Sequence, residues 1–181
     1  PGVVPELGAA IARFAPTEIT ADLSRLSAGD RRALAPLVQA AKLMDEIYLR
    51  QVWGGNAALR DRLAADASPA GKQRLHYFTI NFGPWSALDK GAPFVPGVPA
   101  ERPPGAGFYP EDLTKAQFEA WVQTLPAAEQ ERARGFFTVV RRDAAGQLQL
   151  VPYSQEYKAF LQPAARLLRR ASFTSSADSC E

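Results

Sequence analysis

The fold class is decided by one stretch of three parts: Thr138-Val139-Val140-Arg141-Arg142, then Asp143-Ala144-Ala145-Gly146, then Gln147-Leu148-Gln149-Leu150-Val151. The first part, together with the preceding Phe136 and Phe137, is rich in β-branched and aromatic residues, which is typical of a strand. The last part alternates polar and apolar residues, and the middle part predicts a turn. One isolated hairpin is not stable in water. We therefore expect it to pack on helices or to extend a sheet formed by other sequence.

The longest predicted helix lies upstream of this hairpin. It begins at Ser27, whose hydroxyl can cap it together with Asp30 three residues later. Apolar residues then recur at helical spacing as far as Val52, and Gly54-Gly55 ends the run. Pro36 falls inside the run and is expected to end or kink the helix, unless the first turn begins close to it.

Shorter helices are predicted on both sides of the longest one. Apolar spacing indicates a short helix near Leu7–Phe14, and Asn56 is expected to cap a helix that continues through Leu63. Ser68 followed by Pro69 predicts the start of another helix.

The second half of the chain carries three more helix signals. Thr114 and Gln117 form a capping box, and Pro126 begins a short charged helix that ends at Gly135. After the hairpin, a final helix is expected over Ser154–Leu168, with a kink at Pro163.

A long irregular loop separates these groups of helices. Six prolines between residues 90 and 110 preclude regular helix there, and a loop of this length in a compact domain is usually functional. The predicted fold class is α+β, a predominantly helical lobe with one clear hairpin and this Pro/Gly-rich loop. Residues 1–181 are expected to form a single N-terminal lobe of a longer two-lobed protein.

Composition and charge exclude several classes of protein. The net charge is +2 with interspersed acids and bases, which is no nucleic-acid footprint, and no apolar run is long enough to span a membrane. The single cysteine, Cys180, cannot form an intramolecular disulfide.

The chain begins at Pro1, which favours removal of an upstream segment and a periplasmic or secreted location, with a cytoplasmic one still possible. Residues 172–181 are expected to connect two helices.

Catalytic motifs do not appear in the sequence. The only histidine is His76, and a zinc site typically needs two or three His or Glu ligands. No Gly-x-Ser-x-Gly elbow, phosphate-binding loop or dinucleotide fingerprint occurs. We therefore expect His76 to be structural, and the chain alone to lack catalysis.

Two segments place aromatic residues beside Gly and Pro on irregular backbone. They are Asn81-Phe82-Gly83-Pro84-Trp85 and Gly105-Ala106-Gly107-Phe108-Tyr109-Pro110. Such segments can line a groove in which backbone groups pair with an extended peptide. Alternatively, the aromatic rings anchor the loop to the core. The candidate substrate-binding residues are Phe108, Tyr109, Asn81 and Trp85.

Several motifs resemble, in order, those of the bacterial dipeptidyl peptidase III family. They are Leu43-Met44-Asp45-Glu46-Ile47-Tyr48, Ile80–Trp85 followed by Pro93-Phe94, Gly107–Lys115, and Thr138–Asp143 leading to Val151-Pro152-Tyr153. Each motif alone is weak, and the specificity lies in their order across residues 10–170.

The resemblance implies a two-lobed zinc metallopeptidase that removes dipeptides from peptide N-termini. Its metal site is a His-Glu-x-x-x-His helix with a downstream Glu, and this chain contains neither, so no zinc ligand is carried over. Some relatives carry a fused Nudix domain, but no Nudix box occurs here. Phe108 or Tyr109 is expected to help bind an extended peptide.

Two functions remain open from the sequence. The first is an N-terminal fragment of such an exopeptidase, which supplies cleft wall while zinc is bound by the rest of the protein. The second is a stand-alone, non-catalytic peptide-binding or scaffold domain. A lobe in isolation would expose apolar surface, so we expect it to associate with the remaining lobe or with itself.

Overall fold

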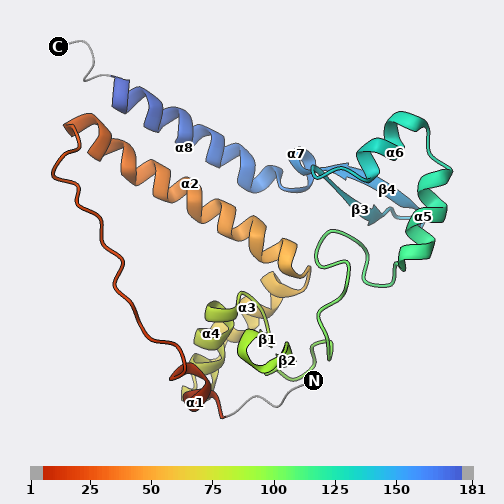
Figure 1. Cartoon of the computed structure of the whole chain (residues 1–181), viewed down its shortest axis with the longest axis horizontal. Helices are drawn as coiled ribbons and strands as arrows, with labels where there is room; N and C mark the ends of the chain where they lie inside the picture. The colour runs from red at the N-terminus through yellow and green to blue at the C-terminus, as the bar shows by residue number, and fades with distance from the viewer. Residues whose placement is uncertain (1–5, 177–181) are drawn as a thin grey trace. The chain divides into compact units, whose positions relative to one another are not determined.

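Residues 6–176 are described in a computed structural model (Figure 1), and Cys180 lies outside them. The chain folds as two compact units. One comprises residues 6–15 and Leu49–Tyr153, and the other comprises Pro16–Tyr48 and residues 154–176. In this described part, no helix is long and apolar enough to cross a membrane.

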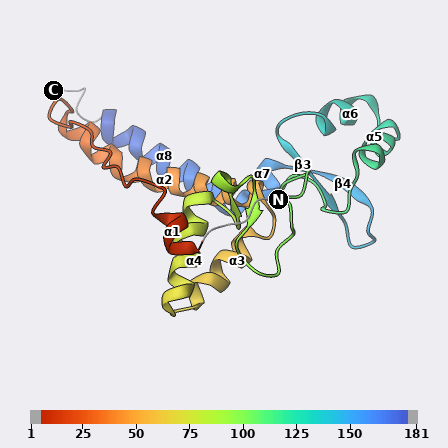
Figure 2. The ribbon, with the colours of Figure 1, turned by 60° about the horizontal axis from the view of Figure 1, so that its bottom comes forward.

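The second unit contains two long helices that run side by side (Figures 1 and 2). They are α2 (Ala28–Val52), of which residues 28–48 belong to this unit, and α8 (Lys158–Ser176). The short α7 (Tyr153–Glu156) precedes α8. Both helices bury small residues. These residues are Ala33 and Ala40 on α2, and Ala164 and Ala171 on α8.

Neither proline ends its helix, so the expectation that Pro36 could end the longest helix is wrong, whereas the kinks expected at Pro36 and Pro163 stay predictions. Helix α2 continues through Pro36, and α8 continues through Pro163. Each proline removes one backbone hydrogen bond, but the apolar faces on either side stay packed, and this packing outweighs the loss. The predicted final helix breaks at Tyr157 instead, and α8 extends to Ser176. The first residues of the expected connection at 172–181 are therefore helical.

The first unit is built on a helical core. Its helices are α1 (Leu7–Ile11), α3 (Asn56–Ala65) and α4 (Pro69–Asn81), and the predicted Ser68 cap of α4 is confirmed, since its hydroxyl accepts from the Gly71 amide at 3.0 Å. Buried apolar residues of α3 and α4 form one cluster with a residue near the end of α2 and one that follows β2. The cluster comprises Leu49, Leu59, Leu63, Phe78 and Val95.

The rest of the first unit holds the strands and two further helices. The predicted hairpin is confirmed as β3 (Thr138–Arg142) paired with β4 (Leu148–Pro152), although Phe136 and Phe137 precede the strand and are exposed. Helix α5 (Lys115–Gln123) has the predicted capping box, and α6 (Ala127–Ala133) follows it. A second small antiparallel pair, β1 (Trp85–Ser86) with β2 (Ala92–Pro93), encloses the 3-10 turn η1 (Ala87–Asp89), which the sequence did not predict.

Asn56 does not cap α3, because Gly55 occupies the cap position. The Asn56 side chain is instead fully buried, and its Nδ2 donates to the Leu49 carbonyl at 3.0 Å and to the Phe82 carbonyl at 3.1 Å. One amide group thus joins the end of α2, the start of α3 and the residue after α4. Phe82 is held there in the left-handed region at φ 51°.

The segment around Gly107 joins the end of α2 to the hairpin. The Gly107 amide donates to the Gln51 carbonyl at 2.9 Å, which satisfies one of the last carbonyls of the helix. The Val140 amide donates to the Phe108 carbonyl at 2.9 Å, and Arg141 donates to the Gly107 carbonyl at 3.0 Å. A Cβ at position 107 would lie 1.8 Å from the Arg50 carbonyl oxygen, so only glycine fits.

The turn that follows α1 is attached to the turn η1 by an ion pair. Arg13 donates from Nη1 to Asp89 Oδ1 at 2.8 Å and to Oδ2 at 3.0 Å, and Ser86 Oγ donates to Asp89 Oδ2 at 2.5 Å. The hydrogen bond from Ser86, followed by that from Arg13, lowers the pKa of Asp89 below its ordinary value of 3.8. The charged carboxylate is therefore the form that the fold stabilises.

We predict that Gly107→Ala destabilises the chain by about 3 kcal/mol, because backbone rather than a flexible side chain blocks the added methyl group. Gly83→Ala is the matched control. Its Cβ would meet only Asn56 and Trp85, at 3.5–3.6 Å, and its effect should stay below about 1 kcal/mol. Urea unfolding followed by circular dichroism measures both. Equal effects of the two variants would show that the close approach at Gly107 is not present in solution.

The lowered pKa of Asp89 predicts how the stability of the chain depends on pH. A depressed folded-state pKa contributes stability that is complete above the unfolded-state pKa and is lost as pH falls through the folded-state pKa. The stability difference between wild type and Asp89→Asn should therefore be constant from neutral pH to about pH 5 and shrink only below it. Urea unfolding at a series of pH values measures this difference. A difference that grows as the solution becomes more acidic would contradict the prediction.

Candidate functional site

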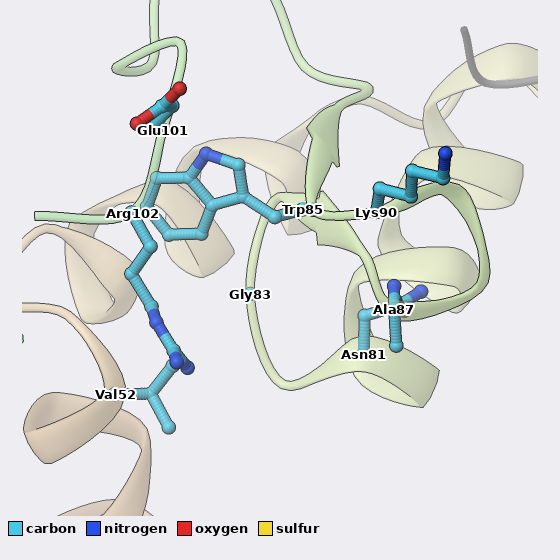
Figure 3. A pocket seen from close by; sticks show the side chains of 9 residues that line it. Val52, Asn81, Gly83, Trp85, Ala87, Lys90, Glu101 and Arg102 are labelled. Atoms are coloured by element: carbon cyan, nitrogen blue, oxygen red, sulfur yellow. Dashed lines mark hydrogen bonds between the residues drawn. The ribbon is translucent and has the colours of Figure 1, made fainter. Parts of the chain in front are cut away.

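The candidate site is a pocket of about 560 Å³ in the first unit (Figure 3). Its wall is formed by the ends of α2 and α4, by the β1–β2 turn and by the Pro/Gly-rich loop. It is lined by Val52, Asn81, Gly83, Trp85, Ala87, Lys90, Gly91, Glu101 and Arg102. Two of the four candidate residues, Asn81 and Trp85, are therefore brought together.

Asn81 and Trp85 are both anchored by hydrogen bonds. Asn81 Nδ2 donates to the Tyr77 carbonyl at 2.9 Å, and its Oδ1 accepts from the Ala87 amide at 2.9 Å. Trp85 Nε1 donates to the Pro99 carbonyl at 3.0 Å, and its ring meets Trp53 edge to face at 5.2 Å. The amide of Asn81 keeps one N–H and one lone pair for a ligand, and the indole of Trp85 offers its ring alone.

Three charged side chains line the same pocket. Among the described residues, Lys90, Glu101 and Arg102 form no ion pair. Figure 3 shows Lys90 pointing away from Arg102, on the other side of Gly83. The two cations can therefore contact different parts of an extended ligand, and Glu101 offers the one negative charge among the lining residues.

Phe108 lies outside this pocket and is fixed to the hairpin. Its carbonyl accepts from Val140 and its ring stacks on Tyr153, with centroids 6.4 Å apart. Phe137 meets the same tyrosine edge to face at 6.3 Å. Burial, and to a smaller extent the neighbouring Tyr109, raises the pKa of Tyr153 above its ordinary value of 10.0.

Tyr109 lines a second, smaller hollow of about 290 Å³. Its ring meets Phe118 of α5 edge to face at 5.2 Å. The other lining residues come from the loop and from the start of α5. They are Pro104, Gly105, Leu113, Thr114, Lys115, Phe118 and Glu119.

Sequence reasoning missed the charged lining of the larger pocket. Glu101 and Arg102 sit between prolines in the irregular loop, and no pattern predicts where such a loop returns to the fold. For Lys90 the sequence contains a weak signal, because the glycine that follows it, Gly91, is typical of a turn. In the structure Lys90 adopts a left-handed φ of 55° at the end of η1.

The described residues do not fit a zinc site. Within residues 6–176, no group of three His, Cys, Asp or Glu side chains could hold a metal ion. His76 is exposed on α4. We therefore derive no chemical step from a metal on this part of the chain.

Comparison with known proteins gives matches in both sequence and structure. No family model matches the chain. The structure of dipeptidyl-peptidase III from Corallococcus sp. strain EGB has a TM-score of 0.87 and 49% sequence identity, over 96% of this chain and 32% of that chain. The structure of DPP III from Caldithrix abyssi has a TM-score of 0.84 and 42% identity, over 91% of this chain and 30% of that chain.

A curated relative carries a different name. Nudix hydrolase 3 from Arabidopsis thaliana is 35% identical over 207 aligned residues, which cover 88% of this chain and 27% of that protein. The chain thus spans about a third or less of the length of each protein that it matches. Because two solved dipeptidyl-peptidase III structures match it over nearly its whole length, in fold and in sequence, the chain belongs to the dipeptidyl peptidase III family and represents its N-terminal portion.

Proposed function

We propose that this peptidase-related chain is part of a zinc-dependent exopeptidase that releases dipeptides from peptide N-termini. In that enzyme it contributes a wall of the substrate cleft, and zinc is bound by residues outside this chain. The observation that carries the proposal is the likeness to the Corallococcus dipeptidyl-peptidase III, with a TM-score of 0.87 and 49% identity across 96% of the chain.

The larger pocket supplies the proposed cleft wall. Asn81 has a free N–H and a free lone pair that match the groups of a peptide backbone. Lys90 and Arg102 can bind peptide carbonyl or carboxylate oxygens, and Glu101 can bind an ammonium group. Trp85 offers an apolar ring for a substrate side chain.

Phe108 and Tyr109 would bind other parts of the peptide. Tyr109 borders the smaller hollow, whose other lining residues include Leu113 and Phe118, so an apolar side chain fits there. The ring of Phe108 is only partly buried and is held by the hairpin, which presents it on a rigid support.

The name of the Arabidopsis relative does not change this proposal. That match covers most of the residues that the two dipeptidyl-peptidase III structures also cover. The shared segment contains no Nudix box. We infer that the common segment belongs to the peptidase-like portion of that protein.

We also propose that the remaining part of the protein covers apolar surface on the second unit. A hollow of about 440 Å³ lies between α2 and α8, lined mainly by apolar residues that include Leu34, Leu37 and Leu168. Val38 and Tyr48 on α2 are each more than half exposed. Apolar surface of this kind is typical of a face that meets another part of a protein.

We predict that the full-length protein cleaves a chromogenic dipeptidyl amide and releases dipeptides from an oligopeptide with a free N-terminus. Both activities should disappear after chelation and return with zinc, while this chain alone shows none. Mass spectrometry of the products identifies the fragments released. Peptide binding without cleavage by the full-length, zinc-loaded protein would favour the non-catalytic binding domain instead.

Charge removal in the pocket should weaken substrate binding rather than the reaction itself. In the full-length enzyme, we predict that Lys90→Gln and Arg102→Gln each raise KM about 3- to 10-fold with little change in kcat. Lys72→Gln and Arg62→Gln, which alter exposed cations of the same unit outside the pocket, are the matched controls. If the control variants raise KM equally, the pocket is not where the substrate binds.

A further inference from the structure

A chain of hydrogen bonds lies behind the pocket wall formed by the β1–β2 turn. Tyr77 and Ser86 are fully buried, and their hydroxyl oxygens lie 2.7 Å apart. Ser86 Oγ donates its only proton to Asp89 Oδ2 at 2.5 Å, so Tyr77 must donate to Ser86. Arg13 completes the chain by donating to both oxygens of the Asp89 carboxylate.

The turn therefore has two faces with different roles. One face lines the pocket with Ala87, Lys90 and Gly91. The other face makes the hydrogen bonds behind the pocket, through Ser86 and Asp89. The backbone of the turn is closed by the Gly91 amide, which donates to the Ser86 carbonyl at 2.9 Å. Arg13 Nη2 also reaches the carbonyl of Leu88, at 3.4 Å.

This arrangement holds the turn in an unfavourable backbone conformation. Lys90 and Gly91 follow one another in the left-handed region, at φ 55° and 75°. Glycine adopts this region freely, but a lysine does so only when its surroundings hold it there. The contacts to Asp89 fix the residue immediately before Lys90, and so determine where the lysine enters the pocket wall.

We propose that Arg13 and Asp89 are positioning residues for peptide binding, because they set the conformation of the turn that carries Lys90. The inference rests on the proposed function, since it assigns these two residues to the same pocket. Arg13 comes from the turn that follows α1, 76 residues before Asp89 in the sequence, so this N-terminal segment fixes the binding wall from outside.

The geometry of the ion pair separates this role from a role in global stability. The side chains of Arg13 and Asp89 are 36% and 12% exposed, so water reaches the pair mainly at the arginine, and its net contribution to the free energy of unfolding is small compared with that of the helical core. Arg13 nevertheless holds the turn at two places, because Nη1 contacts both carboxylate oxygens of Asp89 and Nη2 donates to the Leu88 carbonyl. Loss of the pair should therefore alter the turn while the helical core stays folded.

The test uses the full-length enzyme with Arg13→Met, Asp89→Asn and the double variant. We expect each single variant to raise KM about 3- to 10-fold with kcat kept within about 2-fold, and the double variant to add little more. Arg13→Lys should raise KM less than Arg13→Met does, because lysine keeps the charge but lacks the second nitrogen that reaches the Leu88 carbonyl. Arg74→Met is the matched control, since it breaks the pair with Asp66, whose arginine side chain is also 36% exposed and which lines neither hollow of this unit.

Amide hydrogen exchange gives a second readout that does not depend on catalysis. In Arg13→Met, protection of the Gly91 amide should fall about tenfold, while that of the Val140 amide in the hairpin stays unchanged. An active enzyme whose KM is unchanged in Arg13→Met overturns the positioning role. A wild-type enzyme that releases no dipeptide overturns the proposed function instead, and the exchange of Gly91 still decides whether Arg13 holds the turn.

Discussion

The buried amide of Asn56 is the contact on which the first unit depends. Its two N–H bonds end on carbonyls that no helix can satisfy, one near the end of α2 and one just after α4. Buried carbonyls without a donor are costly, so this single side chain fixes where three helices meet. It also fixes Phe82, and the chain then leaves the core through Gly83 and Pro84 to reach Trp85 in the pocket wall.

The position of the pocket wall depends on this junction and on the hydrogen bonds that Gly107 makes. Trp53, just past the end of α2, packs on Trp85 and donates to Glu111 at 2.5 Å. Trp53 therefore contacts the pocket wall through Trp85 and the segment that leads to α5 through Glu111. The segment Gly107–Pro110 mainly connects the end of α2 to the hairpin, because the backbone of Gly107 and Phe108 makes the hydrogen bonds to both of these elements.

Local signals in the sequence were enough to predict most of the elements. The Ser68 cap, the Thr114–Gln117 box and the alternating strand at 148–152 depend on neighbouring residues, and the structure has all three. The cap expected at Asn56 and the helix end considered at Pro36 are both wrong, because these outcomes depend on packing and on partners far along the chain. For the same reason, Asn81 and Trp85 could be proposed for a binding site, whereas Glu101 and Arg102 could not.

The hydrogen bond between Gln51 and Gly107 has a consequence for how the protein folds. The last turn of α2 receives this donor from a residue made 56 positions later, so the helix end stays incomplete while the ribosome synthesises α3, α4 and the loop. Contacts between residues far apart in sequence form late, because a long loop must close first. During translation, the Gln51 carbonyl therefore has to be hydrated until the segment around Gly107 has been made.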